Sequence, residues 1–525
     1  MNIRVLHNAR IFTGVARHPW AHALAIANGH VVALDNAALD WRGGPDVVLE
    51  DLGGALVTPG LTDAHIHLMW YAQSLRELEL RDLDRASTMG AVAARAAQTA
   101  PGTWITGRGW DQNIWQDTGF PTAAELDRVA HRHPVMLNAK SGHAVVANTL
   151  AMQAGGVTAE TPDPEHGRIA RDERGRPTGL LFEDAIAYVG RVKPRPELDE
   201  LADLMVEAQR NLMARGITGV HDVDGNPAFS TVQILKRQGR LRIRVVKYVR
   251  IEALDGLIAC GLRSGMGDDQ LRFGGLKLFA DGALGARTAA MFEPYEGEPD
   301  NLGILTLTPE RLMDISKRAA ANGLALAIHA IGDRTNSIVL DVLEAVKSID
   351  AGLRHRIEHV QLISQADQAR LGRAGFVASM QPTHAIHDAR MADRYWGDRN
   401  AGAYAWRSVQ AAGAPLAFGS DCPIEVFDPF LGLYAAVSRR SETDGYPGAQ
   451  GWYSQQRLTL SESLRAYTWG AAYAAGMEER LGCLAPGYHA DLIVLDRNIF
   501  ELPPEALLET KVQRTMIEGI WQTLG

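Results

Sequence analysis

Eight short apolar segments alternate with helical segments through the middle of the chain. They are Leu56–His67, Gly216–Asp222, Ile243–Val249, Gly275–Asp281, Leu324–Ala330, His355–Val360, Phe376–Pro382 and Pro415–Asp421. This alternation is typical of βα units, in which each strand is followed by a helix that returns the chain to the same edge of the sheet. Eight such units are what a closed parallel barrel requires. We therefore predict an α/β fold built on a (β/α)₈, TIM-like barrel.

The spacing of these segments also predicts how the chain divides into domains. From the second segment to the eighth, each gap has room for one helix, but the first gap is far longer. We therefore expect a barrel over residues 58–479, with an inserted subdomain at about residues 70–210. Short strand-like segments at both chain ends predict a small β-sandwich domain made of residues 1–57 and 480–525, since chain termini commonly lie close together.

Composition narrows the class of protein. Of the 525 residues, 46% are hydrophobic and 22% charged, as in an ordinary soluble globular protein. The net charge of −9 argues against a nucleic-acid partner. Three cysteines are too few for a disulfide framework, and the start MNIRVLHNARIF lacks the apolar core of a signal peptide. No segment has the length of a membrane span, so we expect a cytoplasmic protein that acts on a small molecule, with no membrane partner.

Residues that can bind a metal ion lie at the ends of several predicted strands. The first strand ends in Asp-Ala-His65-Ile-His67. Side chains alternate along a strand, so His65 and His67 project to the same face and can bind one ion. Two partly exposed histidines without a ligand are the alternative interpretation.

The later strands carry similar groups. Lys277 lies inside an apolar strand, where a salt bridge to Asp281 would be its ordinary structural role. His329 and His359 end the fifth and sixth strands, and either alone is more commonly a hydrogen-bonded core residue. Asp421 ends the eighth predicted strand, where an isolated aspartate is usually a helix N-cap.

Taken together, these residues predict a metal site. In a parallel barrel all the strands end at the same mouth, so five strands would deliver potential ligands to one place. Imidazole and carboxylate ligands suit Zn²⁺ and neighbouring first-row metals.

The same segments resemble a known family. The motifs PGLTDAHIHL, KLFADGALGARTA, AIHAIGD, RIEHVQ and GSDCPIE are similar to those of the amidohydrolase superfamily, in its amidohydrolase-3 branch, which includes N-substituted formamide deformylase. The resemblance covers nearly the whole chain, from AIANGHVVALD through GRGWDQNIW, SGHAVVANTLAM and GRPTGLLFEDA to PGYHADLIVLD and TMIEGI.

The resemblance implies roles for individual residues. His65 and His67 correspond to the first pair of metal ligands, and His329 and His359 to the ligands on the fifth and sixth strands. Lys277 falls where many members carry a lysine that CO₂ has carboxylated. Asp421 matches the aspartate that touches both the metal and the attacking water, and is the expected catalytic residue. One or two Zn²⁺ ions, or another divalent metal, and possible homodimer formation are also implied.

The implied activity is hydrolysis of a carbon–nitrogen bond other than a peptide bond, in an N-substituted formamide or another N-acyl amine. A zinc-dependent deaminase of an amino-heterocycle is one alternative, although deaminases of this superfamily usually lack the strand-four lysine. A non-catalytic regulatory protein on the same fold is the other.

Candidates for substrate contact come from the loops and the insertion, since βα loops carry specificity in barrels. Arg287 follows the fourth strand and His384 the seventh. In the insertion, His143 is a candidate donor to the substrate carbonyl, while Trp110 and Asp111 are candidates for shaping the pocket. For Trp110 and His143 a structural role is the alternative.

Overall fold

The computed structural model describes residues 3–44, 46–115, 119–140, 142, 144–164, 167–194 and 196–523. The chain divides into two compact units. The larger consists of Met1–Leu68 and Met205–Gly525, and the smaller of Met69–Leu204. Each unit has a hydrophobic core of its own.

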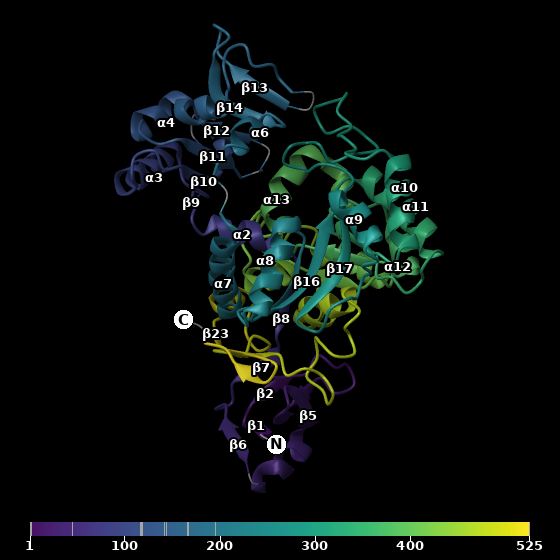
Figure 1. The fold of residues 1–525 in the computed structure, drawn as a ribbon. Helices are drawn as coiled ribbons and strands as arrows, with labels where there is room; N and C mark the ends of the chain where they lie inside the picture. Colours follow the sequence, from purple (N-terminus) through teal and green to yellow (C-terminus); the bar gives the residue numbers. More distant parts are fainter. Residues whose placement is uncertain are drawn as a thin grey trace. The chain divides into compact units, whose positions relative to one another are not determined.

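The larger unit contains the predicted barrel (Figure 1). Its eight strands follow one another in chain order, and each neighbouring pair is parallel. They are β8 (Leu61–Ile66), β15 (Ile217–Asp222), β16 (Arg244–Arg250), β17 (Leu271–Phe279), β18 (Leu326–Ala330), β19 (Arg356–His359), β20 (Val377–Met380) and β21 (Leu416–Phe418). Every predicted segment contains one of these strands or overlaps it, which confirms the TIM-like architecture.

Backbone hydrogen bonds close the barrel between its first and last strands. The amide of Asp421 donates to the carbonyl of His65 over 2.7 Å, and the amide of His67 donates to that of Cys422 over 2.8 Å. These bonds lie where β8 ends and the loop after β21 begins. They therefore fix Asp421 beside the two histidines of the first strand.

Helices lie around the outside of the barrel strands in Figure 1. In α11, Val339, Leu343 and Val346 recur at helical spacing and are fully buried, which is the pattern of a helix packed on a sheet. The helices that follow the second and later barrel strands are α8 (Asn226–Arg237), α9 (Leu254–Ala259), α10 (Pro309–Ala321), α11 (Asp333–Lys347), α12 (Gln365–Ala374), α13 (Pro382–Tyr395), α14 (Trp406–Ala411), α15 (Pro429–Ser438), α16 (Leu460–Arg465) and α17 (Ala471–Ala474).

Strands from both chain ends pair in one six-stranded sheet of the larger unit. Its order is β24 (Ile520–Trp521), β23 (Val512–Ile517), β22 (Leu492–Leu495), β7 (Leu56–Pro59), β2 (Arg10–Phe12) and β3 (Trp20–Ala21). A four-stranded sheet contains β5 (His30–Leu34), β4 (Leu24–Ala27), β1 (Ile3–His7) and β6 (Val47–Asp51). In the six-stranded sheet, strand β7 is separated from barrel strand β8 by one residue, so the six-stranded sheet is continuous in sequence with the barrel.

The smaller unit has its own six-stranded sheet. The sheet order is β13 (Gly167–Arg171), β14 (Pro177–Glu183), β12 (Ala144–Ala147), β11 (Val135–Ala139), β10 (Ile105–Trp110) and β9 (Leu78–Glu79). Its helices include α3 (Arg85–Gln98), α4 (Ala123–Ala130), α5 (Thr149–Ala154) and α6 (Ile186–Gly190). Helix α4 begins with a capping box in which Thr122 and Glu125 satisfy each other's backbone amides. Helices α2 (Leu68–Ser74) and α7 (Leu198–Ala214) contain the two boundaries between the units.

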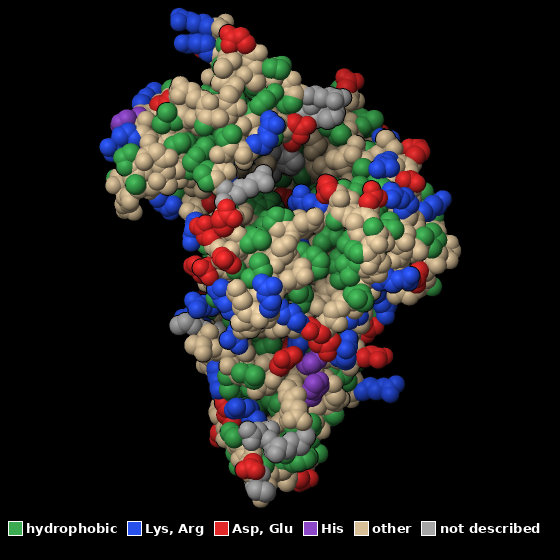
Figure 2. Space-filling view, viewed as in Figure 1, with side chains coloured by type: hydrophobic (Ala, Val, Ile, Leu, Met, Phe, Trp, Pro, Cys, Tyr) green, Lys and Arg blue, Asp and Glu red, His purple; other side chains and the backbone are tan. Residues whose placement is uncertain are grey.

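Acidic and basic side chains are interspersed on the face of the molecule drawn in Figure 2. Within the described part of the chain, no helix combines the length and apolar character that crossing a bilayer requires.

The close approach of the first and last barrel strands can be tested at Gly419, which lies between β21 and Asp421. A Cβ atom at Gly419 would lie 2.4 Å from the backbone nitrogen of His65 and 2.7 Å from Oδ1 of Asp63. We expect Gly419→Ala to destabilise the protein by about 1–3 kcal/mol, as other overpacked sites do, and to lower the midpoint of urea unfolding. Gly256→Ala is the control, because its Cβ meets open space on α9. Equal midpoints for the two variants would contradict this account of closure.

Candidate metal centre

The ends of five barrel strands bring the predicted ligands to one mouth of the barrel. β8, β17, β18 and β19 carry ligands at or near their C-terminal ends, and the loop after β21 carries the last. These residues are His65, His67, Lys277, His329, His359 and Asp421. All except His329 are buried, and the His329 side chain is 12% exposed. The predicted metal ligands therefore meet at one mouth of the barrel, as expected for parallel strands.

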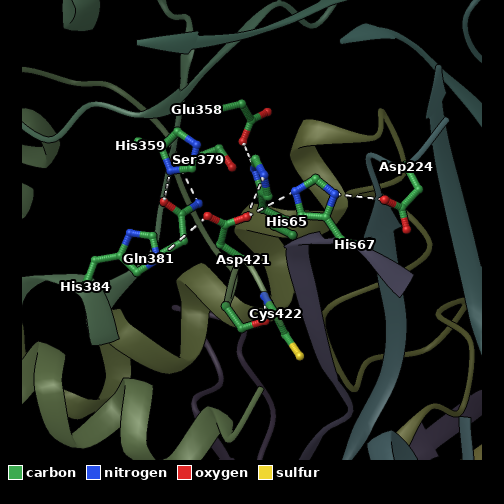
Figure 3. Close-up of polar contacts among 12 residues, drawn as sticks. His65, His67, Asp224, Glu358, His359, Ser379, Gln381, His384, Asp421 and Cys422 are labelled. Atoms are coloured by element: carbon green, nitrogen blue, oxygen red, sulfur yellow. Dashed lines mark hydrogen bonds and ion pairs between the residues drawn. The ribbon is translucent and has the colours of Figure 1, made fainter. Parts of the chain in front are cut away.

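Asp421 lies at the centre of this group (Figure 3). Nε2 of His65 and Nε2 of His67 each lie 3.4 Å from its Oδ1. The ligand atoms of these three residues lie within 4.8 Å of one another, and those of His359, His384 and Asp421 do so as well. Burial alone would raise the pKa of Asp421, but the adjacent His65 and His67 hold that pKa well below its usual range. Asp421 is therefore a carboxylate in this arrangement.

In three of the histidines, the Nδ1 atom forms a hydrogen bond with another side chain. Nδ1 of His65 bonds Glu358 over 2.5 Å, and Nδ1 of His67 bonds Asp224 over 2.9 Å. Nδ1 of His359 donates to Oε1 of Gln381 over 2.8 Å. When the ring is neutral, a proton on Nδ1 leaves the Nε2 lone pair for a ligand. Burial would lower the pKa of His67, but Asp224 and Asp421 raise it to about 9, so a metal ion at Nε2 of His67 would displace a proton. A ring nitrogen held by a second side chain in this way is typical of metal-binding histidines.

Buried cations lie beside both acidic supports. Arg356 donates to Glu358 and, over 2.6 Å, to the carbonyl of Ala64. Burial would raise the pKa of Glu358, but the positive charge of Arg356 holds that pKa well below its usual range. Lys247 donates to the carbonyl of Asp224 over 2.6 Å. Buried charges are tolerated when they are paired in this way.

Lys277 differs from the other buried cations. Its side chain is 1% exposed, and among the described residues Nζ has no hydrogen-bond partner. Burial lowers the pKa of Lys277 to about 8. Asp281 does not pair with it, because that carboxylate accepts the backbone amides of Ala290, Ile331 and Gly332 over 3.0, 3.1 and 2.9 Å. The salt bridge considered as the ordinary role of Lys277 is therefore not formed.

His329 adopts the opposite tautomer from the other three. Its Nε2 donates to the carbonyl of Gly282 over 3.0 Å, which leaves the lone pair on Nδ1. The ring packs edge-on against His359, with centroids 4.6 Å apart. Burial lowers the pKa of His329 to about 3, so the ring is neutral. His329 thus lies next to the group around Asp421 without belonging to either set of three.

Two predicted substrate residues lie on the barrel loops. His384 is in the first turn of α13, and its Nε2 lies 3.8 Å from Oδ2 of Asp421. Arg287 is engaged within its own surroundings, since it forms an ion pair with Glu298 at 2.7 Å and donates to the hydroxyl of Tyr395 over 3.1 Å. The structure therefore brings His384, rather than Arg287, to the carboxylate.

The remaining predicted contacts belong to the smaller unit. Trp110 is fully buried in that unit's core, and its indole donates to the carbonyl of Leu137 over 2.9 Å. This favours the packing role for its side chain. Asp111 follows at the end of β10 and is partly buried. His143 lies outside the described residues.

Sequence reasoning did not identify Asp224, Gln381 or Gln361 as part of this site. Each follows a barrel strand by no more than two residues, which is the same positional signal that identified the ligands. Asp222, the last residue of β15, pairs with Lys247 at 3.1 Å and accepts the amide of Asp224, so it supports no histidine directly.

These residues fit a divalent metal ion. Oriented imidazole lone pairs and a carboxylate are the donors that Zn²⁺ and its neighbours prefer. The buried amine of Lys277 contacts the ring of Phe279 but has no hydrogen-bond acceptor among the described residues, as expected of a group that is completed by something bound beside it.

Comparison with known proteins gives a consistent picture. A model of the family described as amidohydrolase family matches residues 48–520. Over 512 residues, covering 94% of this chain and 87% of the relative, the chain is 32% identical to protein LONG AFTER FAR-RED 3 of Arabidopsis thaliana. It is also 32% identical to the putative amidohydrolase YtcJ of Bacillus subtilis, over 91% of this chain and 90% of YtcJ.

A further relative has a named substrate class. N-substituted formamide deformylase of Arthrobacter pascens is 27% identical over 98% of this chain and 97% of its own length. Among solved structures, a metal-dependent hydrolase from Pyrococcus horikoshii superposes with a TM-score of 0.81 at 30% identity. That superposition covers 96% of this chain and 99% of the hydrolase.

The support of His67 by Asp224 can be tested directly. In Asp224→Ala the Nδ1 proton of His67 loses its acceptor, so the ring is no longer held in the metal-binding tautomer. We expect metal affinity to fall by about 10–100-fold, as when such supports are removed elsewhere. The metal affinity of each variant is measured by competition with a chromogenic chelator. Asp255→Ala, at an exposed aspartate on α9, is the control. Unchanged affinity in Asp224→Ala would show that Asp224 does not orient the ligand.

Proposed function

Since this chain belongs to the amidohydrolase family, we propose that it hydrolyses the C–N bond of an N-substituted formamide or another N-acyl amine, using Zn²⁺. The observation that carries this proposal is the convergence on Asp421. The Nε2 atoms of two imidazoles each lie 3.4 Å from the same carboxylate oxygen. The Nδ1 atom of each of these rings forms a hydrogen bond with an acidic side chain. A structural core would have no need of so many oriented and buried lone pairs.

The proposed metal ligands are His65, His67, His329, His359 and Asp421, with Lys277 as a sixth after carboxylation by CO₂. Carboxylation would turn a buried cation without a partner into an anion beside the metal. The orphaned Nζ of Lys277 supports this assignment, because no described residue otherwise satisfies it.

Hydrolysis of an amide needs an activated water, a stabilised oxyanion and a protonated leaving nitrogen. A bound divalent ion supplies Lewis acidity, which makes water acidic near neutral pH. Asp421 accepts the proton of the attacking water and then passes it to the departing nitrogen. Oδ1 of Asp421 faces His65 and His67, and Oδ2 faces away from that pair toward His384. Oδ2 is therefore the oxygen we assign to proton transfer.

Hydrolysis of an amide is favoured over deamination of a heterocycle by Lys277, since deaminases on this barrel usually lack that lysine. The similarity to a formamide deformylase along nearly the whole chain also supports an amide substrate. Release of ammonia from an aminated ring, with no amine and carboxylic acid produced, would instead favour the deaminase.

The proposed function is tested by metal analysis together with a panel of N-formyl and N-acyl amines. We expect stoichiometric zinc and release of an amine and a carboxylic acid from at least one member. In Asp421→Asn we expect bound metal but a kcat lowered at least about a hundredfold, because general acid–base catalysis is lost. Protein that binds no stoichiometric zinc would contradict the proposal and support a non-catalytic role. Near-normal turnover by Asp421→Asn would refute its part in proton transfer.

Carboxylation of Lys277 gives a separate test. Protein incubated with ¹³C-bicarbonate and zinc is expected to show a carbamate carbon signal by NMR, which Lys277→Ala abolishes and Lys347→Ala, at an exposed lysine, retains. Lys277→Ala should also lose much of its metal and activity, and added acetate or propionate should partly restore both. Full metal content and rate in Lys277→Ala would rule out a bridging lysine.

A further inference from the structure

His384 presents a buried donor to the space beside Asp421. It lies in the first turn of α13, directly after β20, and its side chain is 8% exposed. In Figure 3 its ring lies on the opposite side of Asp421 from His67. The His384 ring is parallel to that of His359, at an interplanar angle of 8° and a centroid distance of 6.0 Å.

The tautomer of His384 follows from its neighbour Gln361. Nε2 of the Gln361 amide, which can only donate, contacts Nδ1 of His384 at 3.1 Å. Nδ1 is therefore the acceptor, and the ring proton is on Nε2. This differs from His65, His67 and His359, whose Nδ1 atoms face acceptors and whose Nε2 atoms keep lone pairs.

The Nε2–H group of His384 has no hydrogen-bond acceptor among the described residues. The nearest recorded oxygen, Oδ2 of Asp421, is 3.8 Å away, which is too far for a hydrogen bond. A buried donor without an acceptor is unfavourable, so such a group in a native protein calls for an explanation. A ligand atom that enters beside Oδ2 would supply the missing acceptor.

We propose that Nε2–H of His384 donates to the carbonyl oxygen of the substrate and stabilises the oxyanion formed there. The inference rests on the hydrolytic function proposed above. When the water oxygen bonds to the carbonyl carbon, the C=O electron pair moves to oxygen and Asp421 takes the water proton. The C=O bond then re-forms, the C–N bond breaks, and the nitrogen leaves with that proton. His384 stays neutral and donates its hydrogen bond throughout.

The position of His384 suits this role better than that of a further metal ligand. A ring nitrogen of His384 lies within 4.8 Å of ligand atoms of His359 and Asp421, as a ligand's would. However, Nε2 carries the proton and has no lone pair to offer while Gln361 donates to Nδ1. A hydrogen-bond donor that is held beside the proton-accepting oxygen is already oriented toward the substrate carbonyl. It therefore stabilises the substrate most strongly in the transition state, when negative charge develops on the carbonyl oxygen.

The test uses the zinc-loaded full-length protein and methylphosphonate, a small tetrahedral oxyanion. His384→Phe keeps a planar ring without the N–H, and His384→Gln restores an N–H donor of shorter reach. We expect both variants to hold as much zinc as the parent. Calorimetry should show methylphosphonate binding weakened about 10–100-fold in His384→Phe, and by less in His384→Gln, as expected for loss of a hydrogen bond to a charged group.

His355→Gln is the matched control, since His355 is also buried and lies immediately before β19, at the other end of the barrel strands. It should bind methylphosphonate as the parent does. Unchanged affinity in His384→Phe, or no binding of methylphosphonate by the zinc-loaded parent, would overturn the inference. Loss of zinc from both His384 variants would overturn it in favour of a ligand role. Failure of the parent to bind zinc would instead contradict the proposed function.

Discussion

Two backbone hydrogen bonds join the ends of the first and last barrel strands, and the candidate site depends on them. They connect Asp421 to His65 and His67 to Cys422. Asp63 strengthens the junction, because its carboxylate accepts both the amide and the hydroxyl of Ser420. Through this closure, residues separated by more than 350 positions in the sequence face one another at fixed distances. Ligand geometry is thus a consequence of how the barrel closes.

Burial of charge is the second constraint on the site. Arg356 is paired with Glu358, and Lys247 with Asp222 and the backbone of Asp224. Glu358 and Asp224 in turn orient His65 and His67. The paired charges therefore determine which nitrogen of each ring faces the centre. At the site, Lys277 and His384 each have a buried nitrogen without a hydrogen-bond partner among the described residues. Our proposals about Lys277 and His384 rest on these two unsatisfied nitrogens.

The sequence predicted the barrel well because strand spacing and the positions of polar residues at strand ends are local signals. His65 and His67 were recognisable from alternation along one strand, and Lys277 from its position in an apolar one. The partners of these residues were not recognisable. Alternation does not tell which loop side chain turns back to a given imidazole, so Asp224 and Gln381 became apparent only from the contacts of the folded chain. The absence of a Lys277–Asp281 salt bridge likewise depends on how the loop around Ala290 folds.

The smaller unit illustrates the same limit. Trp110 lies in a motif that resembles the family, but whether an aromatic side chain packs or recognises a ligand depends on tertiary contacts, which the sequence does not contain. The central claim, that imidazoles from three strands and one carboxylate share a cation, is tested most directly by anomalous diffraction at the zinc edge from crystals grown with zinc. The account predicts a peak within bonding distance of His65, His67 and Asp421. A peak elsewhere, or none at this mouth of the barrel, would contradict it.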